Sequence, residues 1–439
     1  MPFIPHTESE INDMLNTIGV QNVDDLFDEI PTAIRAKPFG NIPESLNEAH
    51  LARLMGERAA QDAEQLNFIG AGAYQHHIPA AVWDIVSRGE YMTAYTPYQA
   101  EASQGSLQLI YEYQTMMASL MGMEVSNASL YDGASALAEA ILMAVRCQRN
   151  KHRVLVVGPI APNYWQTIKS ITAHHQLDIQ TCTFDTLHQQ GHNELAAVVI
   201  PQPSFLGDIQ DVHTITDWAH SHEALVVGLV NPLAMALLTP PSQWGERGAD
   251  IACGEGQPLG VPIASGGPYF GFLTCQKQWL RQMPGRIVGK TEDKNGKTGY
   301  CLTLQAREQH IRRSKATSNI CTNQGLLVTA ATIYMSLMGP EGLRRTALAS
   351  HHNANVLKQR VSAIEGIKII SQQPTFHEFV IQLSEPVQSF LDRAAEQNIQ
   401  AGFDLSGLPG YENCLLLCST EIHNDQDHDR LAQLLAGRQ

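Results

Sequence analysis

The fold is decided by Arg153-Val-Leu-Val-Val-Gly158 and by the apolar runs that follow it at intervals along the chain. Four further runs have the same strand-like character: Ile179–Phe184, Ala196–Ile200, Leu225–Val230 and Asp250–Cys253. Several are continuous β-branched runs, which are typical of strands buried on both faces of a sheet. Helical patterns separate most of them. The alternation predicts an α/β fold with a wound, mostly parallel sheet and with ligand chemistry at the strand ends.

A second, smaller domain is expected after this sheet. The apolar helix pattern from Asn323 to Met338 ends at Gly339-Pro340, and a helix followed by strand, strand, helix and strand patterns continues the chain. We therefore expect a large α/β domain over residues 67–339 and a small C-terminal α+β domain over residues 340–439.

The first 66 residues differ from both domains. Thr7 and Glu10 form a capping-box pattern that opens a short helix, which is expected to stop at Gly19. A second helical run follows at about 47–66. This N-terminal helical arm, residues 1–66, has too little apolar surface to fold alone. It must lie on the body of the protein or on a partner.

Composition excludes several classes of function. The chain has 439 residues, of which 44% are apolar, and its 44 acidic against 29 basic side chains give a formal charge of −15. This balance argues against binding of nucleic acid or of an anionic membrane. The N-terminus has neither a basic start nor an apolar core, and we find no run of about 18 uninterrupted apolar residues. We expect a soluble, cytoplasmic protein.

Cysteine and histidine residues give no sign of a metal centre. The eight cysteines form no C-x-x-C pair and are expected to be reduced thiols, mostly buried. His188 and His192 have the spacing of two ligands on one helix face, but Gly191 interrupts that helix and no third ligand lies nearby. We predict no metal site.

Two neighbouring segments are unusually rich in polar aromatic side chains. They read Phe68-Ile-Gly-Ala-Gly-Ala-Tyr-Gln-His-His-Ile-Pro79 and Thr93-Ala-Tyr-Thr-Pro-Tyr-Gln99. Gly70 and Gly72 allow a tight turn. Any one tyrosine here is more simply explained as a packing residue with a locally bonded hydroxyl. The density of such residues favours a functional loop.

Two other segments could bind an anion. Ser129 to Ala136 leads small residues and Ser135 into a helix N-terminus, which suits an anion but is explained equally by a plain capped helix, the interpretation that the sequence alone favours. The segment from Leu304 to Gln324 concentrates positive charge in an acidic protein: Arg307, His310, Arg312, Arg313 and Lys315. It suits a phosphate or a carboxylate, or it is a solvated basic loop.

Gly-Ala-Gly-Ala-Tyr-x-His-x-Ile-Pro, Thr-Ala-Tyr-Thr-Pro-Tyr-Gln and Leu-Gln-Ala-Arg-Glu-Gln-His-Ile-Arg-Arg closely resemble motifs of glycine decarboxylase, the P-protein of the glycine cleavage system. The resemblance covers nearly the whole chain and is greatest to subunit 1 of the form that is split into two polypeptides. It implies a fold-type-I pyridoxal-phosphate (PLP) enzyme, a fold that the predicted domains also suit. Such enzymes need a lysine for the internal aldimine and a carboxylate at the pyridine nitrogen.

This chain lacks both groups where the fold would place them. No lysine lies between Lys169 and Lys277, and Asn231-Pro232 follows Leu225–Val230 where a carboxylate is expected. A neutral amide cannot hold a pyridinium as an aspartate does. We therefore expect no working cofactor in the pocket of this chain. The resemblance implies that subunit 2 supplies the lysine and most PLP contacts, and that this chain closes the active site across the interface.

The resemblance also implies site residues and partners. The residues expected to orient glycine or to form a polar wall beside it are Tyr95, Tyr98, Gln99, His76 and His77. Those expected to reach the cofactor phosphate of the partner are Thr317, Ser318, Asn319 and Arg312. The assembly, a heterotetramer of two subunits 1 and two subunits 2, would decarboxylate glycine and pass the aminomethyl group to the lipoyl arm of the H-protein, which makes it formally an oxidoreductase.

Two alternatives stay open. The chain could be a self-contained enzyme of the same fold, with Lys277 or Lys290 as the cofactor lysine, or a scaffold subunit without a part in catalysis. The first is disfavoured because Lys290 lies in a loop rich in glycine and lysine, and Lys277 begins a helix beyond the expected strand. Retention of the whole Thr93–Gln99 motif weighs against the second.

Overall fold

The computed structural model describes residues 5–36, 40–62, 65–92, 96–191 and 193–437, and it divides into two compact units, residues 1–64 and 65–439. The first unit contains α1 (Glu8–Ile18) and α2 (Glu48–Ala59). The side chain of Thr7 caps α1 in a capping box, and Gly19 ends it in the left-handed region, as predicted. The second helix is shorter than expected, because it passes into a single 3-10 turn at 60–62.

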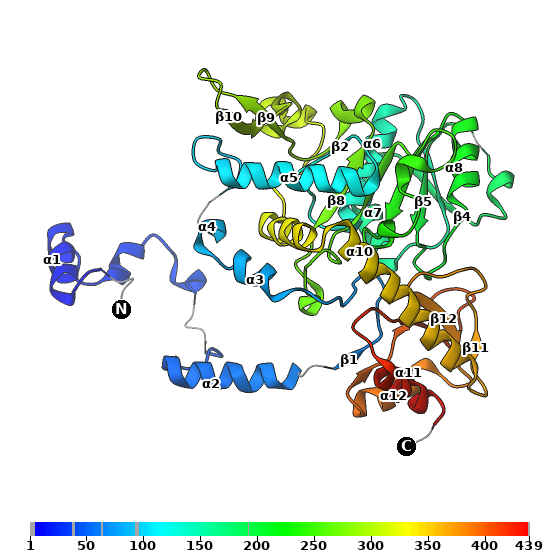
Figure 1. Ribbon diagram of the computed structural model, residues 1–439. Helices are drawn as coiled ribbons and strands as arrows, with labels where there is room; N and C mark the ends of the chain where they lie inside the picture. The colour runs from blue at the N-terminus through cyan, green and yellow to red at the C-terminus, as the bar shows by residue number, and fades with distance from the viewer. Residues whose placement is uncertain (1–4, 37–39, 63–64, 93–95, 192, 438–439) are drawn as a thin grey trace. The chain divides into compact units, whose positions relative to one another are not determined.

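A seven-stranded sheet forms the centre of the second unit (Figure 1). Its strands, in spatial order, are β2 (Val125–Ser126), β8 (Gly271–Cys275), β7 (Ile251–Glu255), β6 (Leu225–Val230), β5 (Leu195–Gln202), β3 (Arg153–Val157) and β4 (Asp178–Cys182). The five strands from β7 to β4 are parallel to one another, and β8 alone runs against them, antiparallel both to β7 and to β2. The predicted wound, mostly parallel sheet is confirmed.

Helices cover both faces of this sheet, which explains the continuous apolar strands. Val154 and Val156 pack in one core with α6 (Gly133–Cys147) and α7 (Pro162–Thr172). Leu155 and Val157, pointing the other way, pack in a second core. The helices of that second core are α3 (Ala80–Val86), α5 (Gln104–Met121), α8 (Val212–Ser221) and the first part of α10 (Gly325–Ser362).

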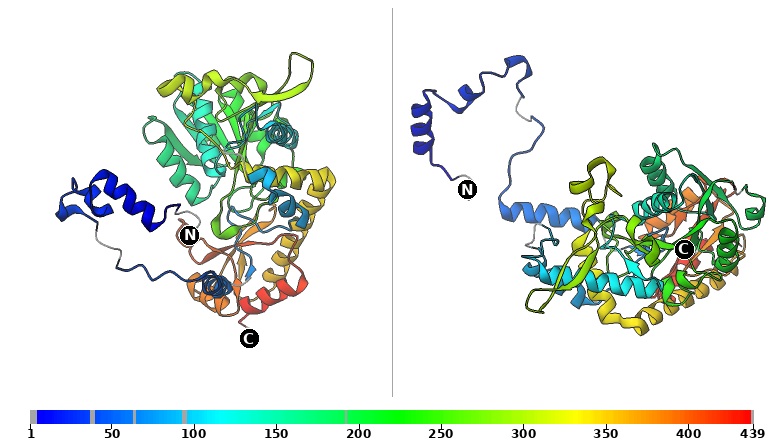
Figure 2. Two further views of the ribbon diagram at one scale, coloured as in Figure 1. Left: turned by 90° about the vertical axis from the view of Figure 1, so that its left-hand side faces the viewer. Right: turned by 90° about the horizontal axis from the view of Figure 1, so that it is seen from above.

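Helix α10 connects the large sheet to the small one, as Figures 1 and 2 show. It packs against α5 and α3 at one end and against α12 (Asp425–Leu435) and the small sheet at the other. Gly339 interrupts it with non-helical angles, φ 58° and ψ 179°, so the predicted break before Pro340 is present. By length and composition alone α10 could cross a membrane, but half of its most apolar window is buried, as in the core helices of soluble proteins.

The small sheet is antiparallel, with the strand order β11 (Lys368–Ile369), β12 (Glu378–Gln382), β15 (Cys414–Cys418) and β14 (Phe403–Asp404). Its apolar face packs on α11 (Val387–Glu396), α12 and the second part of α10. Strand β1 (Leu66–Asn67) pairs with β13 (Ile399–Gln400), so the chain passes the small domain before it enters the large one. The exact division at 66 and 339 stays a prediction.

The described part of the second unit also contains shorter elements. Among them are α4 (Gly89–Met92), the hairpin of β9 (Val288–Glu292) and β10 (Thr298–Leu302), and the single-turn helix α9 (Gln309–Arg312). The hairpin contains the Gly- and Lys-rich segment.

Candidate functional site

A small cavity lies at the carboxyl edge of the parallel strands, where wound sheets bind their ligands. Its volume is about 80 Å³. It is lined by the ends of β5, β6 and β7, by the segments that follow β3, β5, β6 and β7, and by two residues of the glycine-rich loop (residues 70–77). The lining residues are Ile160, Ala161, Tyr164, Pro201, Pro203, Ser204, Phe205, Leu229, Val230, Asn231, Glu255, Pro258, Gly72 and Tyr74. An apolar cavity that holds one benzene molecule measures about 150 Å³. A pyridine ring with a phosphate does not fit.

Glu255 lines this cavity, and its carboxyl group occupies the N-terminus of α6. Oε2 of Glu255 accepts a hydrogen bond from the backbone N–H of Gly133 at 2.9 Å, and Oε1 accepts one from the N–H of Gln257 at 3.2 Å. Asp132 caps the same helix through the N–H of Ser135 at 2.7 Å. Burial, and to a smaller extent the charge of Asp132, raise the pKa of Glu255 to about 8. The capped-helix interpretation of this segment is confirmed.

The positions expected to serve a cofactor are bonded within the protein. Oδ1 of Asn231 accepts from the N–H of Leu233 at 2.9 Å, and its Nδ2 lies 3.3 Å from Nε2 of His377. Gln257, which follows β7, bonds both backbone groups of Tyr74 at 2.8 Å. None of the described residues that line the cavity is a lysine. The residues present do not fit PLP.

The two lysines considered for a self-contained enzyme are not placed to bind a cofactor in this cavity. Lys277 follows β8 and Lys290 lies on β9; both are exposed, and neither lines the cavity. The structure therefore disfavours that alternative.

The glycine-rich loop, residues 70–77, joins the large domain to the small sheet. Tyr74 donates its hydroxyl to Glu378 at 2.8 Å, and the N–H of Ala71 donates to the same carboxylate at 2.7 Å. Gly70 has a φ of 58°, and a Cβ there would lie 2.5 Å from Cβ of Cys418, so only glycine fits. Burial raises the pKa of Glu378 to about 7.

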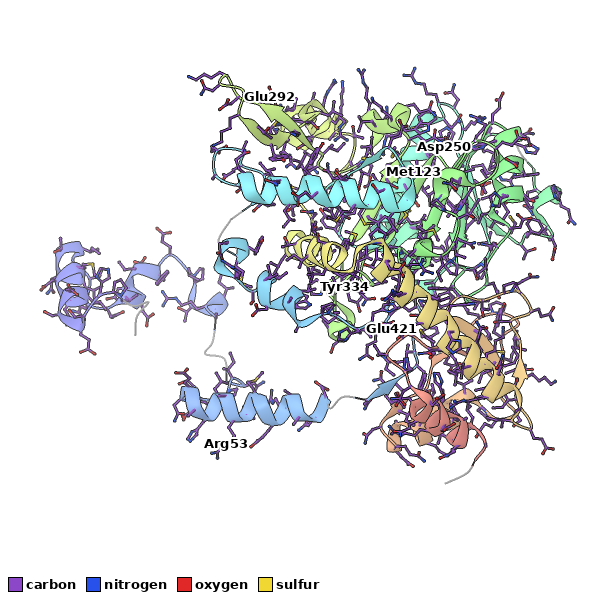
Figure 3. All side chains as sticks on the ribbon, viewed as in Figure 1. Arg53, Met123, Asp250, Glu292, Tyr334 and Glu421 are labelled. Atoms are coloured by element: carbon purple, nitrogen blue, oxygen red, sulfur yellow. The ribbon has the colours of Figure 1, made fainter. Side chains whose placement is uncertain are left out.

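The two histidines of this loop meet Glu421, which lies beyond β15. Nδ1 of His76 lies 2.7 Å from Oε2 of Glu421, and the N–H of His77 donates to Oε1 at 2.7 Å. Tyr334 of α10 lies close by (Figure 3), and burial, with a smaller effect of the charge of Glu421, raises the pKa of its hydroxyl. The His76 side chain thus has a protein partner at this junction, while that of His77 is exposed. Their predicted contact with substrate stays a prediction.

A second cluster brings together the Thr93–Gln99 motif and the end of the Leu304–Gln324 segment. Tyr98 donates its hydroxyl to Oδ1 of Asn323 at 2.5 Å, and the guanidinium of Arg286 lies 5.3 Å from the Tyr98 ring centre. Nδ2 of Asn323 donates in turn to the carbonyl of Ala128 and to the hydroxyl of Ser129, both at 2.6 Å. Burial raises the pKa of Tyr98. The tyrosine is therefore fixed as a neutral hydrogen-bond donor.

A cavity of about 370 Å³ opens beside this cluster, within the range of small-molecule sites. Both motifs line it, with residues from the starts of α5 and α10: Tyr91, Met92, Pro97, Ser106, Leu109, Ile110, Thr322, Asn323, Gly325, Leu326 and Thr329. Gln99 is exposed and lines an adjoining hollow with Ser103 and Glu112. Tyr95 lies outside the described residues, as does His192 of the spacing considered for a metal.

The basic segment folds into short turns, and its cations are divided between two roles. Arg307 is half-buried, and its guanidinium donates to the carbonyls of Met283 and Gly285. Arg312 is exposed, although its Nε donates to the carbonyl of Ala306 at 3.1 Å. Arg313 and Lys315 are exposed as well. The segment therefore presents positive charge at the surface.

The three residues proposed to reach a phosphate end this segment. Thr317 is tied by its backbone N–H to the carbonyl of Arg307 at 3.0 Å, and the hydroxyl of Ser318 accepts from the N–H of Ile320 at 3.1 Å. Asn319 is exposed. Their role stays a prediction.

Sequence reasoning missed three residues that define these sites. Asn323 and Arg286 had no assigned role, although an amide just before the start of an apolar helix is a signal that could have drawn attention to Asn323. Glu255 is a single charged residue at the end of an apolar strand, and a charged residue in such a place is a signal that could have drawn attention to it.

Comparison with known proteins first defines the class. A structure of C-DES with glycine covalently linked to its PLP cofactor matches with a TM-score of 0.60 at 15% identity, covering 87% of this chain and 98% of that chain. At this identity the match shows the fold alone. The architecture is that of the fold-type-I PLP enzymes, as predicted.

Closer relatives define the family. The family model of the glycine cleavage system P-protein matches residues 1–435. The probable glycine dehydrogenase (decarboxylating) subunit 1 of Coxiella burnetii (strain Dugway 5J108-111) is 58% identical over 438 residues, covering 97% of each chain. A crystal structure of glycine decarboxylase (P-protein), in inhibitor-bound form, matches with a TM-score of 0.90 at 39% identity over 100% of both chains. The chain belongs to the glycine cleavage system P-protein family, which confirms the resemblance.

Proposed function

We propose that this chain is the subunit 1 half of a cytoplasmic glycine decarboxylase and that it completes an active site whose cofactor is held by subunit 2. One observation carries the proposal: the chain's own sheet-edge pocket is filled by Glu255, Asn231 and Gln257, whereas the cluster of Tyr98 and Asn323 borders an open cavity. The designation of the relatives as subunit 1 supports a partner subunit.

The residues of this chain would hold and orient glycine rather than transform it. PLP bound in the partner would take up the electron pair of the broken bond between the α-carbon and the carboxylate. Tyr98 would fix the side chain of Asn323, which lines the cavity, and the exposed Gln99 would offer its amide to a substrate carboxylate. Tyr95 belongs to the same proposed set.

The surface cations and hydroxyls of the basic segment suit a phosphate group. We assign Thr317, Ser318 and Asn319, with the charge of Arg312, to the partner's cofactor phosphate. The product aminomethyl group would pass to the lipoyl arm of the H-protein, and the assembly would contain two copies of each subunit.

The test is the visible absorption spectrum of the purified chain after addition of PLP and desalting, alone and mixed with subunit 2. We expect a cofactor band, together with glycine-dependent release of CO2, in the mixture alone. A covalent adduct on the lone chain after borohydride reduction would show that one of its own lysines binds the cofactor, and the proposal would fall.

One substitution distinguishes a scaffold role of this chain from a part in catalysis. Tyr95→Ala in the mixed complex is expected to abolish turnover while the complex still assembles, as judged by size-exclusion chromatography with light scattering. Full turnover of this variant, and of Tyr98→Phe and Gln99→Ala, would leave the chain with a structural role only.

A further inference from the structure

The first turn of α6 has the properties of an anion site, yet a side chain of the protein occupies it. Unpaired backbone N–H groups and the helix dipole make a helix N-terminus attractive to phosphate. Here the N–H of Gly133 bonds Glu255 at 2.9 Å, and that of Ser135 bonds Asp132 at 2.7 Å. The group that fills the position of a ligand is therefore the carboxyl of Glu255.

We propose that Glu255 is a specificity-determining residue that takes the place of a phosphate at α6 and so excludes phosphorylated ligands, PLP among them, from the pocket of this chain. The inference deepens the proposed function and rests on it in one respect, since it explains why cofactor binding would be left to the partner. The chemistry of the isolated chain tests it separately.

The carboxyl group is held from both sides. The N–H of Gln257 bonds Oε1, while that of Gly133 bonds Oε2, so rotation of the side chain would break two hydrogen bonds. The end of β7 packs directly on α6, because a Cβ at Gly133 would lie 2.7 Å from the backbone nitrogen of Glu255 and 2.2 Å from the hydroxyl of Tyr164. No space remains for a phosphate between the helix and the strand.

A small cavity lies beside Glu255. Its volume of about 80 Å³ lies directly against this side chain and against Tyr164, whose hydroxyl has no hydrogen-bond partner among the described residues. Replacement of Glu255 by alanine removes a carboxymethyl group, which is close in size to a phosphate. That space would join the cavity, free the N–H of Gly133 and leave Tyr164 as a second donor.

The charges around the pocket favour exclusion as well. No lysine or arginine lines the cavity among the described residues, and Asp132 stands on the same helix end. A phosphate entering the native pocket would have to displace one carboxyl and approach another. Because Asp132 stays in place, the opened site should bind phosphate weakly.

The test compares Glu255→Ala with Glu255→Gln in the full chain without subunit 2. The glutamine variant is the matched control, since its amide oxygen can still accept from Gly133 but its side chain carries no charge. All forms are compared at about pH 9, above the pKa of about 8 of Glu255, so that the wild-type side chain is ionised. Probes are inorganic phosphate, with chloride at equal ionic strength as reference, and pyridoxine 5′-phosphate, which lacks the aldehyde and forms no imine with surface lysines. Binding is measured by calorimetry and by the shift of the Gly133 amide resonance.

We expect saturable binding of both probes to the alanine variant, at least tenfold tighter than to wild type or to the glutamine variant. Binding to the glutamine variant equal to that of the alanine variant would show that charge rather than occupation excludes the ligand, and would overturn the proposal. Absence of binding to a folded alanine variant would overturn it too.

Should the alanine variant fail to fold, Glu255→Ser serves in its place, and the wild-type chain gives an independent result. Saturable binding of phosphate by wild type, with a shift of the Gly133 resonance, would contradict exclusion. Failure of this proposal can be told apart from failure of the proposed function. The absorption spectrum of the mixed subunits tests whether the partner holds the cofactor, whereas the phosphate titration of the isolated chain tests only this pocket.

Discussion

Replacement of Glu421 by alanine is expected to destabilise the protein strongly, because this carboxylate joins three segments. It accepts from Nδ1 of His76 and from the N–H of His77, both at 2.7 Å, and from the hydroxyl of Ser350 at 2.9 Å. The side chains of His76 and Glu421 are 2% and 13% exposed, so water cannot readily replace the lost bond.

The magnitude follows from what each donor can do after the change. The hydroxyl of Ser350 also lies 2.9 Å from the carbonyl of Thr346 and can donate there instead, and the N–H of His77 lies at an exposed residue, so both donors can find another acceptor. His76 cannot, and a buried donor left without an acceptor costs about 1–3 kcal/mol. We expect a loss near the upper end, about 3 kcal/mol, measured by urea unfolding.

A double-mutant cycle with His76→Ala isolates the pair. The summed losses of the two single variants are expected to exceed the loss of the double variant, with a coupling energy above about 1 kcal/mol. Glu341→Ala is the matched control, since this exposed carboxylate binds Arg344 and Arg345 at the surface and should leave the unfolding midpoint almost unchanged. Additive effects in the cycle, or equal effects of the two glutamate variants, would refute the reasoning.

The pH dependence of the same contact has a definite sign. Burial alone would raise the pKa of Glu421, but the hydrogen bond and charge of His76 lower it overall. A carboxyl with a depressed pKa in the folded state stabilises the protein above its ordinary pKa of about 4.3 and ceases to do so as the pH falls. The difference in stability between wild type and Glu421→Ala should therefore shrink below about pH 4.

Three further outcomes are expected. Because burial raises the pKa of Glu255 to about 8, wild type should lose stability relative to Glu255→Gln as the pH rises from about 4.5 to 8, by up to about 1.4 kcal/mol per pH unit. Thermal unfolding of both proteins across this range measures the difference. Parallel plots of stability against pH for the two proteins would contradict the assignment. Tyr98→Phe leaves Oδ1 of Asn323 without a donor, which should cost about 1 kcal/mol in urea unfolding and reduce glycine-dependent CO2 release by the mixed complex; unchanged values of both would show that this hydrogen bond is dispensable. Lys277→Ala and Lys290→Ala should leave the cofactor band and turnover of the complex unchanged, and loss of the band in either would revive the self-contained alternative.

The large fold was predictable because its signals are local. Five strands alternating with helices specify a wound sheet whatever the loops contain, and Gly339 with Pro340 breaks α10 where the sequence places the break. The end of α2 was placed too late, because the helical pattern alone does not show where a last turn tightens into a 3-10 turn.

The contacts of the glycine-rich loop were not predictable, because its partners lie far along the chain. Tyr74 bonds Glu378, 304 residues away, and His76 bonds Glu421, 345 residues away. A tyrosine and two histidines beside two glycines suit a ligand as well as they suit a domain junction. Only the fold shows that buried carboxylates of the small domain receive them.

The position of the proposed catalytic contribution follows from which loops meet. Tyr98 precedes α5 and Asn323 precedes α10, and because these two helices pack on each other, their leading loops come together beside an open cavity. Periodicity predicted the helix that begins near Asn323, but it did not indicate which other helix it packs on. At the sheet edge, where the wound fold would ordinarily bind its ligand, Glu255 fills the first turn of α6. Any part that this chain takes in catalysis is therefore expected at the shared end of α5 and α10, on residues offered to a partner.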